Sequence, residues 1–214
     1  MTQQERANRT EKILRELNIP INPSLPLIED ESEIHIRKAS DIAKRILILT
    51  YLNIIADDEV AKQEIIEFLK NESLWDFLSG EEKSLLAKEK LTTKDKINLS
   101  WRSEAVWTLL WAIKKVDILQ LPTEECNVAD ILNLQPSFFE PTNEFIYTAH
   151  IRESSEILDM SDFIYRLHWA VRDSDFKGQD IPNGMNAGVI YERHYAINWI
   201  TCYEDDWDEI TTDT

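Results

Sequence analysis

Apolar side chains recur every three or four residues along most of this chain, which is the period of an amphipathic α-helix. The pattern predicts helices over residues 3–17, 41–56, 57–71, 81–89, 92–116 and 152–176, and a last helix that contains residues 189–200. Ser40 is the expected N-cap of the second helix, and Thr92 and Thr93 introduce the long fifth one. The stretch NEFIYTAHI, residues 143–151, alternates loosely and predicts either a single strand or the start of a helix.

Proline and glycine divide these helices. Residues 18–33 carry three prolines and predict a linker or extended arm, and the connector after Val116 contains Pro122, Pro136 and Pro141. Residues 176–188, FKGQDIPNGMNAG, hold three of the four glycines and predict a turn region. We expect a mainly α, compact multi-helix bundle-like domain with at most a minor β element. It should form one globular unit over residues 1–214, with an N-terminal helical part (3–95) and a C-terminal helical core (96–214).

Composition and charge narrow the classes of partner. Apolar residues make up 43% of the 214-residue chain, enough for a real core, and the formal net charge is −17. Such acidity argues against nucleic acid and against an anionic membrane surface as partners. The N-terminal residues show no signal-peptide pattern, and no apolar run is long enough to span a membrane. Cys126 and Cys202 form neither a metal spacing nor a disulfide framework, so we expect a reducing cytoplasm.

The scarcity of glycine argues against nucleotide-binding enzymes. The chain has only four glycines and contains neither GxGxxG nor GxxxxGK[ST]. Loops that bind phosphate need glycine so that the backbone can approach the ligand closely. A doubly wound α/β enzyme is therefore not expected.

The last helix places charged residues in an apolar surrounding. In VIYERHYAINWI, residues 189–200, Arg193 projects from the arc formed by Val189, Ile197 and Ile200, and aromatic residues cover much of the opposite side. His194 and Asn198 lie in the mainly polar gap. A helix that is apolar nearly all round is expected to be buried. Arg193 should therefore be buried or lie over a cleft.

Other arginines repeat this anomaly. Arg102 points out of an apolar helix face, and the helix over residues 152–176 interleaves aromatic and charged side chains on one half. A buried guanidinium needs a carboxylate or several carbonyl groups. The available acidic partners are Glu104, Asp162, Asp173 and Glu192. The sequence predicts a buried layer of ion pairs and hydrogen bonds between the last three long helices.

The same residues are the candidates for chemistry. General acid–base catalysis would use His168 or His194, positioned by Asp173 or Glu192. The candidate ligand-binding residues, suited to an anion, are Arg102, Arg166, Arg172, Arg193 and Asn198. The more common role of such a network is structural, with both histidines in interhelical hydrogen bonds.

Metal and nucleophilic chemistry are poorly supported. No metal site and no cofactor are expected, because no HxxxH or HExxH pair fixes two ligands and each of His168 and His194 stands beside an arginine. Cys126 and Cys202 have acidic neighbours that raise a thiol pKa, so both are expected to be inert. In the acidic tail WDEITTDT, Trp207 is expected to anchor the segment on the body.

Four sequence blocks carry a family resemblance. They are WRSEAVWTLLWAI, ILDMSDFIYRLHWAVRDSD, GVIYERHYAINWI and WDEITTDT, and they cover about residues 100–214. Their order and spacing resemble the bacterial domain of unknown function 4272 family, which the N-terminal half resembles only loosely. The resemblance implies a bacterial, cytoplasmic protein and no particular activity. The matching positions are Arg102, Asp162, Tyr165, Arg166, His168, Trp169, Arg172, Asp173, Glu192, Arg193, His194, Asn198, Trp199, Trp207 and Asp208, with the closing Thr-Asp-Thr.

Two hypotheses for function follow. The first is a non-enzymatic binding or interaction protein, with an unknown protein as its partner and a structural polar layer. The second is an enzyme or small-anion-binding protein that uses the same layer as a pocket. A weaker third is an acidic antagonist of a basic toxin or enzyme. A sealed layer beside Arg193 and His168 would favour the first hypothesis, and a solvent-connected cavity there would favour the second.

Overall fold

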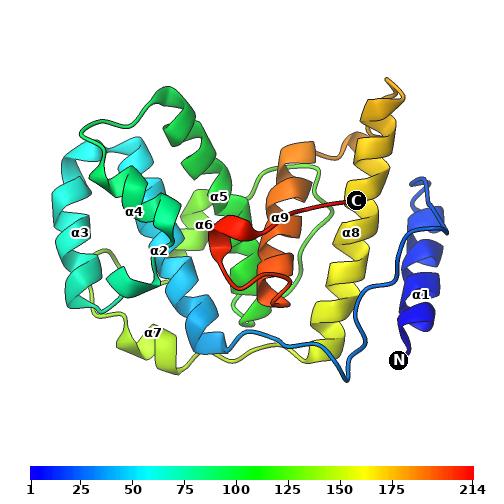
Figure 1. The fold of residues 1–214 in the computed structure, drawn as a ribbon, viewed down its shortest axis with the longest axis horizontal. Coiled ribbons are helices and arrows are strands. Elements are labelled where there is room, and N and C mark those ends of the chain that lie inside the picture. Colours follow the sequence, from blue (N-terminus) through cyan, green and yellow to red (C-terminus); the bar gives the residue numbers. More distant parts are fainter.

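The computed structural model describes residues 1–214 and is entirely helical, with nine α-helices, four short 3-10 turns and no strand (Figure 1). The fold prediction is thereby confirmed, and the allowance for a minor β element was not needed. The helices are α1 (Gln3–Glu16), α2 (Ala39–Asp57), α3 (Lys62–Asn71), α4 (Gly80–Ala87), α5 (Thr93–Ala112), α6 (Val128–Asn133), α7 (Asn143–Tyr147), α8 (Ser154–Phe176) and α9 (Ala187–Ile200).

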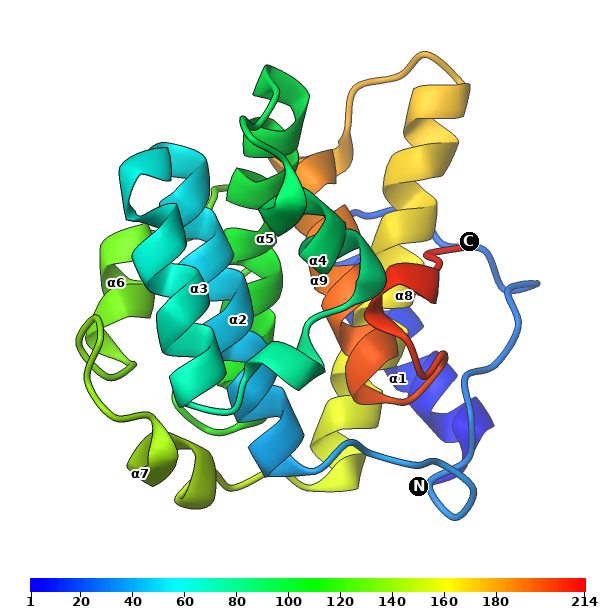
Figure 2. The same ribbon diagram turned by 60° about the vertical axis from the view of Figure 1, so that its left-hand side comes forward.

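Five helices stand side by side in the order α2, α5, α9, α8 and α1, which is not their order along the chain (Figure 1). The most extensive contacts join α2 to α5, α5 to α9, and α8 to α9. Helix α7 packs on α2, and α3 lies on the side of α2 away from α5 (Figure 2). Helix α9 is therefore enclosed between α5 and α8, as its nearly continuous apolar surface predicts.

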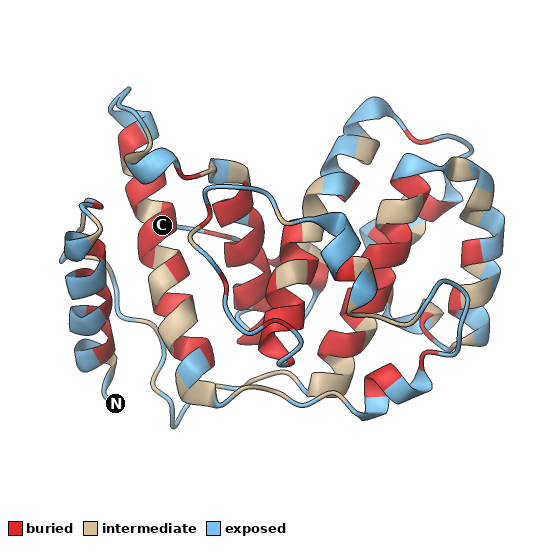
Figure 3. Ribbon diagram, turned by 180° about the vertical axis from the view of Figure 1, so that it is seen from behind, coloured by how far each residue is buried: buried red, intermediate tan, exposed pale blue.

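One large apolar core forms around α2, α5 and α9. Helix α2 is buried along almost its whole length because Ile, Leu and Ala occupy most of its positions (Figure 3). The core residues that are no more than 1% exposed on these three helices include Ile42, Ile46, Leu49, Leu52, Ile55, Val106, Leu109, Leu110, Ile197 and Ile200. Burial of these side chains is the main stabilising contribution of the fold.

A second, smaller apolar cluster attaches α1 to the outside of α8. Its members are Leu14, Ile19, Leu167, Ala170, Val171, Met185 and Ile190. Arg6 and Arg9 on α1 also bind the two carboxylate oxygens of Asp159 on α8, at 2.9 and 2.8 Å. Helix α1 therefore has its own attachment, separate from the main core.

Gly188 is the one glycine that helix packing requires. A Cβ atom at this position would lie only 2.7 Å from the ring of Trp101 on α5. Such a distance is shorter than any real carbon–carbon contact between side chains, so the absence of a side chain lets α5 and α9 approach closely.

Two local predictions need correction, and one open alternative is decided. Residues 143–151 contain the short helix α7 and no strand, which is the second of the two predicted alternatives. The connector after α5 contains the helix α6, which was not predicted. Helix α2 begins at Ala39 with Lys38 as its N-cap, so the prediction of Ser40 was wrong. Lys38 makes no side-chain capping bond, and the backbone N–H of the preceding Arg37 donates to Ile200 O at 3.0 Å.

Two other features were predicted correctly. Thr92 caps α5 through a reciprocal pair of hydrogen bonds with Asp95. None of the helices combines the length and the apolar character that crossing a lipid bilayer would require.

Leu14→Ala should loosen α1 without unfolding the main core. Leu14 is fully buried in the small cluster, and its truncation should cost about 2–5 kcal/mol of local stability. Hydrogen exchange followed by mass spectrometry should show faster exchange over residues 3–16 and unchanged exchange in α2. The control is Ile13→Ala, because Ile13 is 38% exposed. Equal loss of protection in α1 and α2 would contradict a separate attachment.

Candidate functional site

Three consecutive polar residues on α9 organise the candidate site. Glu192, Arg193 and His194 are 6%, 5% and 3% exposed. Successive residues of a helix project about 100° apart, so these side chains leave α9 in different directions. Their partners come from α5 and α8. We call the three residues together with Arg102, Glu104 and His168 the polar layer.

Glu192 binds Arg102 on α5. The Arg102 Nη1 atom donates to Glu192 Oε2 at 3.0 Å, and the guanidinium carbon lies 4.2 Å from the centre of the Tyr195 ring. Burial opposes the charge of Arg102, but the Glu192 carboxylate together with Tyr195 raises its pKa. The Arg102 side chain keeps 23% of its surface exposed, whereas Glu192 keeps 7%. This pair therefore reaches from the interior to the surface.

Arg193 binds Glu104 on α5. Its Nε atom donates to Glu104 Oε2 at 3.3 Å, and its Nη1 atom donates to the Gln120 carbonyl oxygen at 2.6 Å. The other carboxylate oxygen of Glu104 accepts the backbone N–H of Cys126. Burial lowers the pKa of Arg193, and Glu104 opposes that shift. Both side chains are almost completely buried, so neither charge is stable without the other.

His194 binds His168 on α8. The two Nδ1 atoms are 2.8 Å apart, and the rings are nearly perpendicular. Two neutral imidazoles can satisfy this contact only if one donates a proton from Nδ1 and the other accepts it. Burial, followed by the charge of Arg172, lowers the pKa of His168 to about 4. Burial, followed by His168, lowers the pKa of His194 to about 3.

A second buried ion-pair group lies between α8 and α1. The Arg166 Nε atom donates to both oxygens of Asp162, at 3.0 and 3.1 Å, and its Nη1 atom donates to Glu11 at 3.4 Å. Arg15 also donates to Glu11, at 3.0 Å. Sequence reasoning missed Glu11. Its position three residues before the buried Leu14, on the inner face of α1, was the available signal.

Three candidate residues lie outside the predicted layer. Arg172 is exposed and has no hydrogen-bond partner. Asp173 pairs only with the surface Lys177, at 2.6 Å, so its predicted place among the buried partners was wrong. The end of α8 extends beyond α9, and Phe176 is 91% exposed there, so no neighbouring helix covers this part of α8 (Figure 1). Asn198 donates to the Thr211 carbonyl oxygen at 2.8 Å and holds the C-terminal segment.

The C-terminal segment is anchored by Trp207, as predicted. Trp207 is 3% exposed, and its carbonyl oxygen accepts the Tyr195 hydroxyl. Its ring packs edge-on against Tyr195 and Trp199, at 5.0 and 5.4 Å between ring centres. Asp208 then accepts the backbone N–H of Glu81 at 2.8 Å, next to the start of α4. The segment therefore joins α9 to α4.

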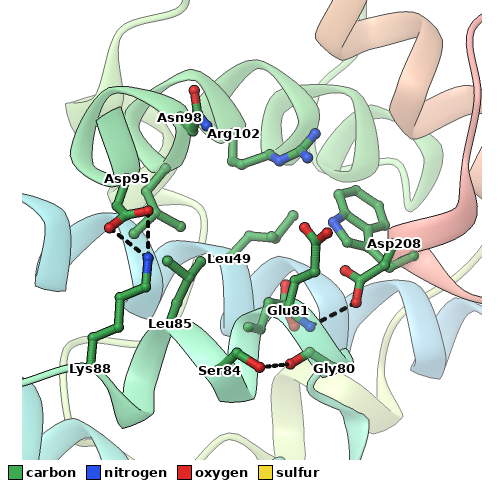
Figure 4. A pocket seen from close by; sticks show the side chains of 13 residues that line it. Leu49, Gly80, Glu81, Ser84, Leu85, Lys88, Asp95, Asn98, Arg102 and Asp208 are labelled. Atoms are coloured by element: carbon green, nitrogen blue, oxygen red, sulfur yellow. Dashed lines mark hydrogen bonds and ion pairs between the residues drawn. The ribbon is translucent and has the colours of Figure 1, made fainter. Parts of the chain in front are cut away.

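The polar layer is closed beside Arg193 and has access to a pocket beside Arg102. The cavity that Arg193 lines, between α8, α9 and the connector after α5, has a volume of about 10 Å³, which holds roughly one water molecule. Arg102 lines a different pocket of about 630 Å³ between α4, α5 and the C-terminal segment (Figure 4). The polar layer is therefore sealed from solvent beside Arg193 and open to a solvent-accessible pocket beside Arg102.

The remaining chemical candidates are weak. Burial, followed by Glu104, raises the pKa of the Cys126 thiol to about 12, and burial also raises that of Cys202, as expected for unreactive cysteines. No group of three or more His, Cys, Asp or Glu side chains is arranged to hold a metal ion.

One comparison with known proteins finds a match. The family model Domain of unknown function (DUF4272) matches residues 6–210. This result confirms the resemblance and extends it through the N-terminal half, where the blocks themselves gave only a loose match. Neither the curated proteins nor the solved structures include a match.

Acidification should destabilise the protein through the histidine pair. The unfolded chain takes up a proton at each histidine near its ordinary pKa of about 6.5, whereas the folded pKa values lie near 4 and 3. The free energy of unfolding should therefore fall as the pH falls from about 6.5 towards 4. Urea unfolding of the native protein and of His168→Asn at several pH values should show a shallower dependence in the variant. His35→Asn, at an exposed position, is the control and should keep the native slope. A stability that stays constant between pH 6.5 and 4.5 would contradict this prediction.

Arg193→Leu should destabilise the fold by about 3–5 kcal/mol, because it leaves the buried Glu104 carboxylate without its cation. Arg172→Leu removes the same charge from an exposed position and should change stability by less than about 0.5 kcal/mol. Thermal and urea unfolding would measure both. An unchanged midpoint in Arg193→Leu would show that the pair contributes nothing.

Proposed function

The chain belongs to the Domain of unknown function (DUF4272) family, and from that premise we propose that it is a non-enzymatic binding or interaction protein whose polar layer is structural. The observation that carries the proposal is the closed environment of Arg193. Its guanidinium group is satisfied by Glu104 and by the Gln120 carbonyl oxygen, and the adjoining cavity has room for roughly one water molecule. A substrate has no space beside this group.

The catalytic candidates do not assemble into an acid–base site. His168 and His194 use their Nδ1 atoms on each other, and Asp173 is partly buried and pairs with the exposed Lys177. General acid–base catalysis works best when a group titrates near the working pH. The folded pKa values of about 4 and 3 keep both imidazoles neutral near pH 7. This arrangement supports a structural role for the pair.

The alternative is an enzyme or a small-anion-binding protein, and Arg102 is the observation in its favour. Arg102 is the one arginine of the polar layer that also lines a pocket of several hundred cubic ångströms. Only its Nη1 atom is used in the pair with Glu192, so the rest of the guanidinium group is available to a carboxylate or phosphate.

The location and partners belong to the same proposal. A formal net charge of −17 favours a cytoplasmic protein that acts on other proteins and disfavours nucleic acid and anionic membranes. The proposed function requires no cofactor. Antagonism of a basic toxin or enzyme is a special case of protein binding.

Titration with small anions separates the two functions. Thermal unfolding of the native protein and of Arg102→Gln would be followed in inorganic phosphate and in citrate, at constant ionic strength. Under the proposed function, neither anion gives a saturable rise in Tm. An anion-binding protein would gain about 2.7 kcal/mol at 100 times its Kd, and Arg102→Gln would lose that gain. A saturable rise that Arg102→Gln abolishes would favour the alternative.

A further inference from the structure

The pocket between α4 and α5 combines an apolar floor with charged walls (Figure 4). Its volume is about 630 Å³, within the range of protein pockets that bind ligands. The apolar lining consists of Leu49, Leu85, Leu99 and Trp207. Side chains of α4 and α5 face each other across the space, and the segment that contains Trp207 and Asp208 closes one end.

Most of the charges that line this pocket are already neutralised. Lys88 donates to both oxygens of Asp95, at 2.9 and 2.8 Å. Glu82 accepts two hydrogen bonds from the buried Arg45. Its Oε2 atom also accepts the backbone N–H of Ser79, the N-cap residue of α4. The pairs leave no net charge on these four residues, so they do not decide which ligand the pocket prefers.

The groups that can still bind a ligand are the carboxylates of Glu81 and Asp208 and the nitrogen atoms of Arg102 that do not contact Glu192. The exposed carboxylate of Glu81 has no hydrogen-bond or ion-pair partner. Asp208 accepts the Glu81 N–H through Oδ2 alone, which leaves Oδ1 free. On the opposite wall, Arg102 uses only Nη1 for Glu192. The two acidic side chains lie on one side of the pocket and Arg102 on the other (Figure 4).

We propose that this pocket is the docking site for a basic segment of a partner protein, an inference that rests on the proposed binding function. A lysine or arginine side chain of the partner binds Glu81 and Asp208, and its aliphatic stem lies on Leu85 and Leu99. Arg102 donates to a backbone carbonyl group of the same segment.

The net charge of the available groups favours a basic ligand over an anionic one. Arg102 is balanced by Glu192 directly behind it, whereas Glu81 and Asp208 have no cation. The available groups of the pocket therefore carry a net negative charge. The formal net charge of −17 adds a long-range field that draws basic proteins towards the surface and repels anions.

Asp208, one of the two acidic side chains, is held in place before any ligand arrives. Asp208 follows Trp207, which is 3% exposed and bound by the Tyr195 hydroxyl. Its hydrogen bond to Glu81 N also fixes it against the first turn of α4. A carboxylate that is already positioned loses little conformational entropy when a ligand binds.

The probe for this site is a fluorescein-labelled peptide that alternates arginine with leucine and serine. Its control is the same peptide with citrulline at every arginine, which keeps the shape and removes the charge. Fluorescence anisotropy would measure the affinity of both peptides for the full-length native chain. The native chain should bind the arginine peptide and should bind the citrulline peptide about tenfold or more weakly.

The matched variants test the position of the site. Glu81→Gln combined with Asp208→Asn removes two charges from the pocket wall and keeps an acceptor for Glu81 N. Glu64→Gln combined with Asp130→Asn removes the same charge from exposed first-turn positions of α3 and α6. The first pair should weaken binding of the arginine peptide about tenfold, and the second should stay near the native affinity.

Three results would overturn the docking site. They are equal weakening by the two variant pairs, equal binding of the two peptides, and no binding of the arginine peptide at all. Each leaves the proposed function standing, because that function depends on the anion titration of Arg102→Gln. Saturable binding of phosphate through Arg102 would overturn both.

Discussion

The fold depends on the partners that α5 and α8 provide for the buried polar residues of α9. A helix enclosed between two others cannot carry Glu192, Arg193 and His194 unless each is satisfied, because an unpaired buried charge costs several kcal/mol. Arg102 and Glu104, two residues apart on α5, oppose Glu192 and Arg193. A shift of α9 along α5 would separate both pairs. Such pairs contribute little net stability compared with apolar packing, so we attribute to them the choice of one register between the two helices.

Arginine also terminates two of the central helices. The side chain of Arg37 donates to the carbonyl oxygens of Trp199, Glu204 and Asp205, at and beyond the end of α9. Arg152 donates in the same way to Trp111, Val116 and Asp117, at and beyond the end of α5. The last carbonyl groups of a helix have no partner within the helix and carry its negative dipole end, which a guanidinium group satisfies. Ordered residues beyond α9 in turn bring Trp207 and Asp208 to α4.

Periodicity predicted that Arg102, Arg166 and Arg193 point inward, and three of the four acidic partners that the sequence offered, Glu104, Asp162 and Glu192, bind them. Periodicity could not supply the partners that depend on long-range packing. The burial of Arg193 follows from the apolar arc of its own helix, so one segment is enough to predict it. The bond between Arg166 and Glu11 joins residues 155 positions apart and exists only because α1 packs on α8. Interhelical hydrogen bonds were the favoured role for His168 and His194, but nothing in the sequence indicated that the two side chains bind each other. The prediction for Arg172 was wrong for a related reason. A helical wheel treats every turn of α8 alike, but the neighbouring helix α9 does not extend to the last turns of α8.

The polar layer and the α4–α5 pocket meet at Arg102. This residue belongs to a buried ion pair that stabilises the fold and also lines the pocket that we propose binds a partner. Glu192 holds one edge of the guanidinium group and Tyr195 lies under its face, so its orientation towards the pocket is set from inside the core. Asp208 in the same pocket is positioned independently, by Trp207 and by its hydrogen bond to the Glu81 backbone N–H in the first turn of α4. A segment bound between Arg102 and Asp208 would contact two regions that are far apart in the sequence and whose polar groups are already positioned. A closed interior that orients the groups at one surface pocket is what a binding protein requires, whereas a catalytic layer would need its titratable groups at that surface.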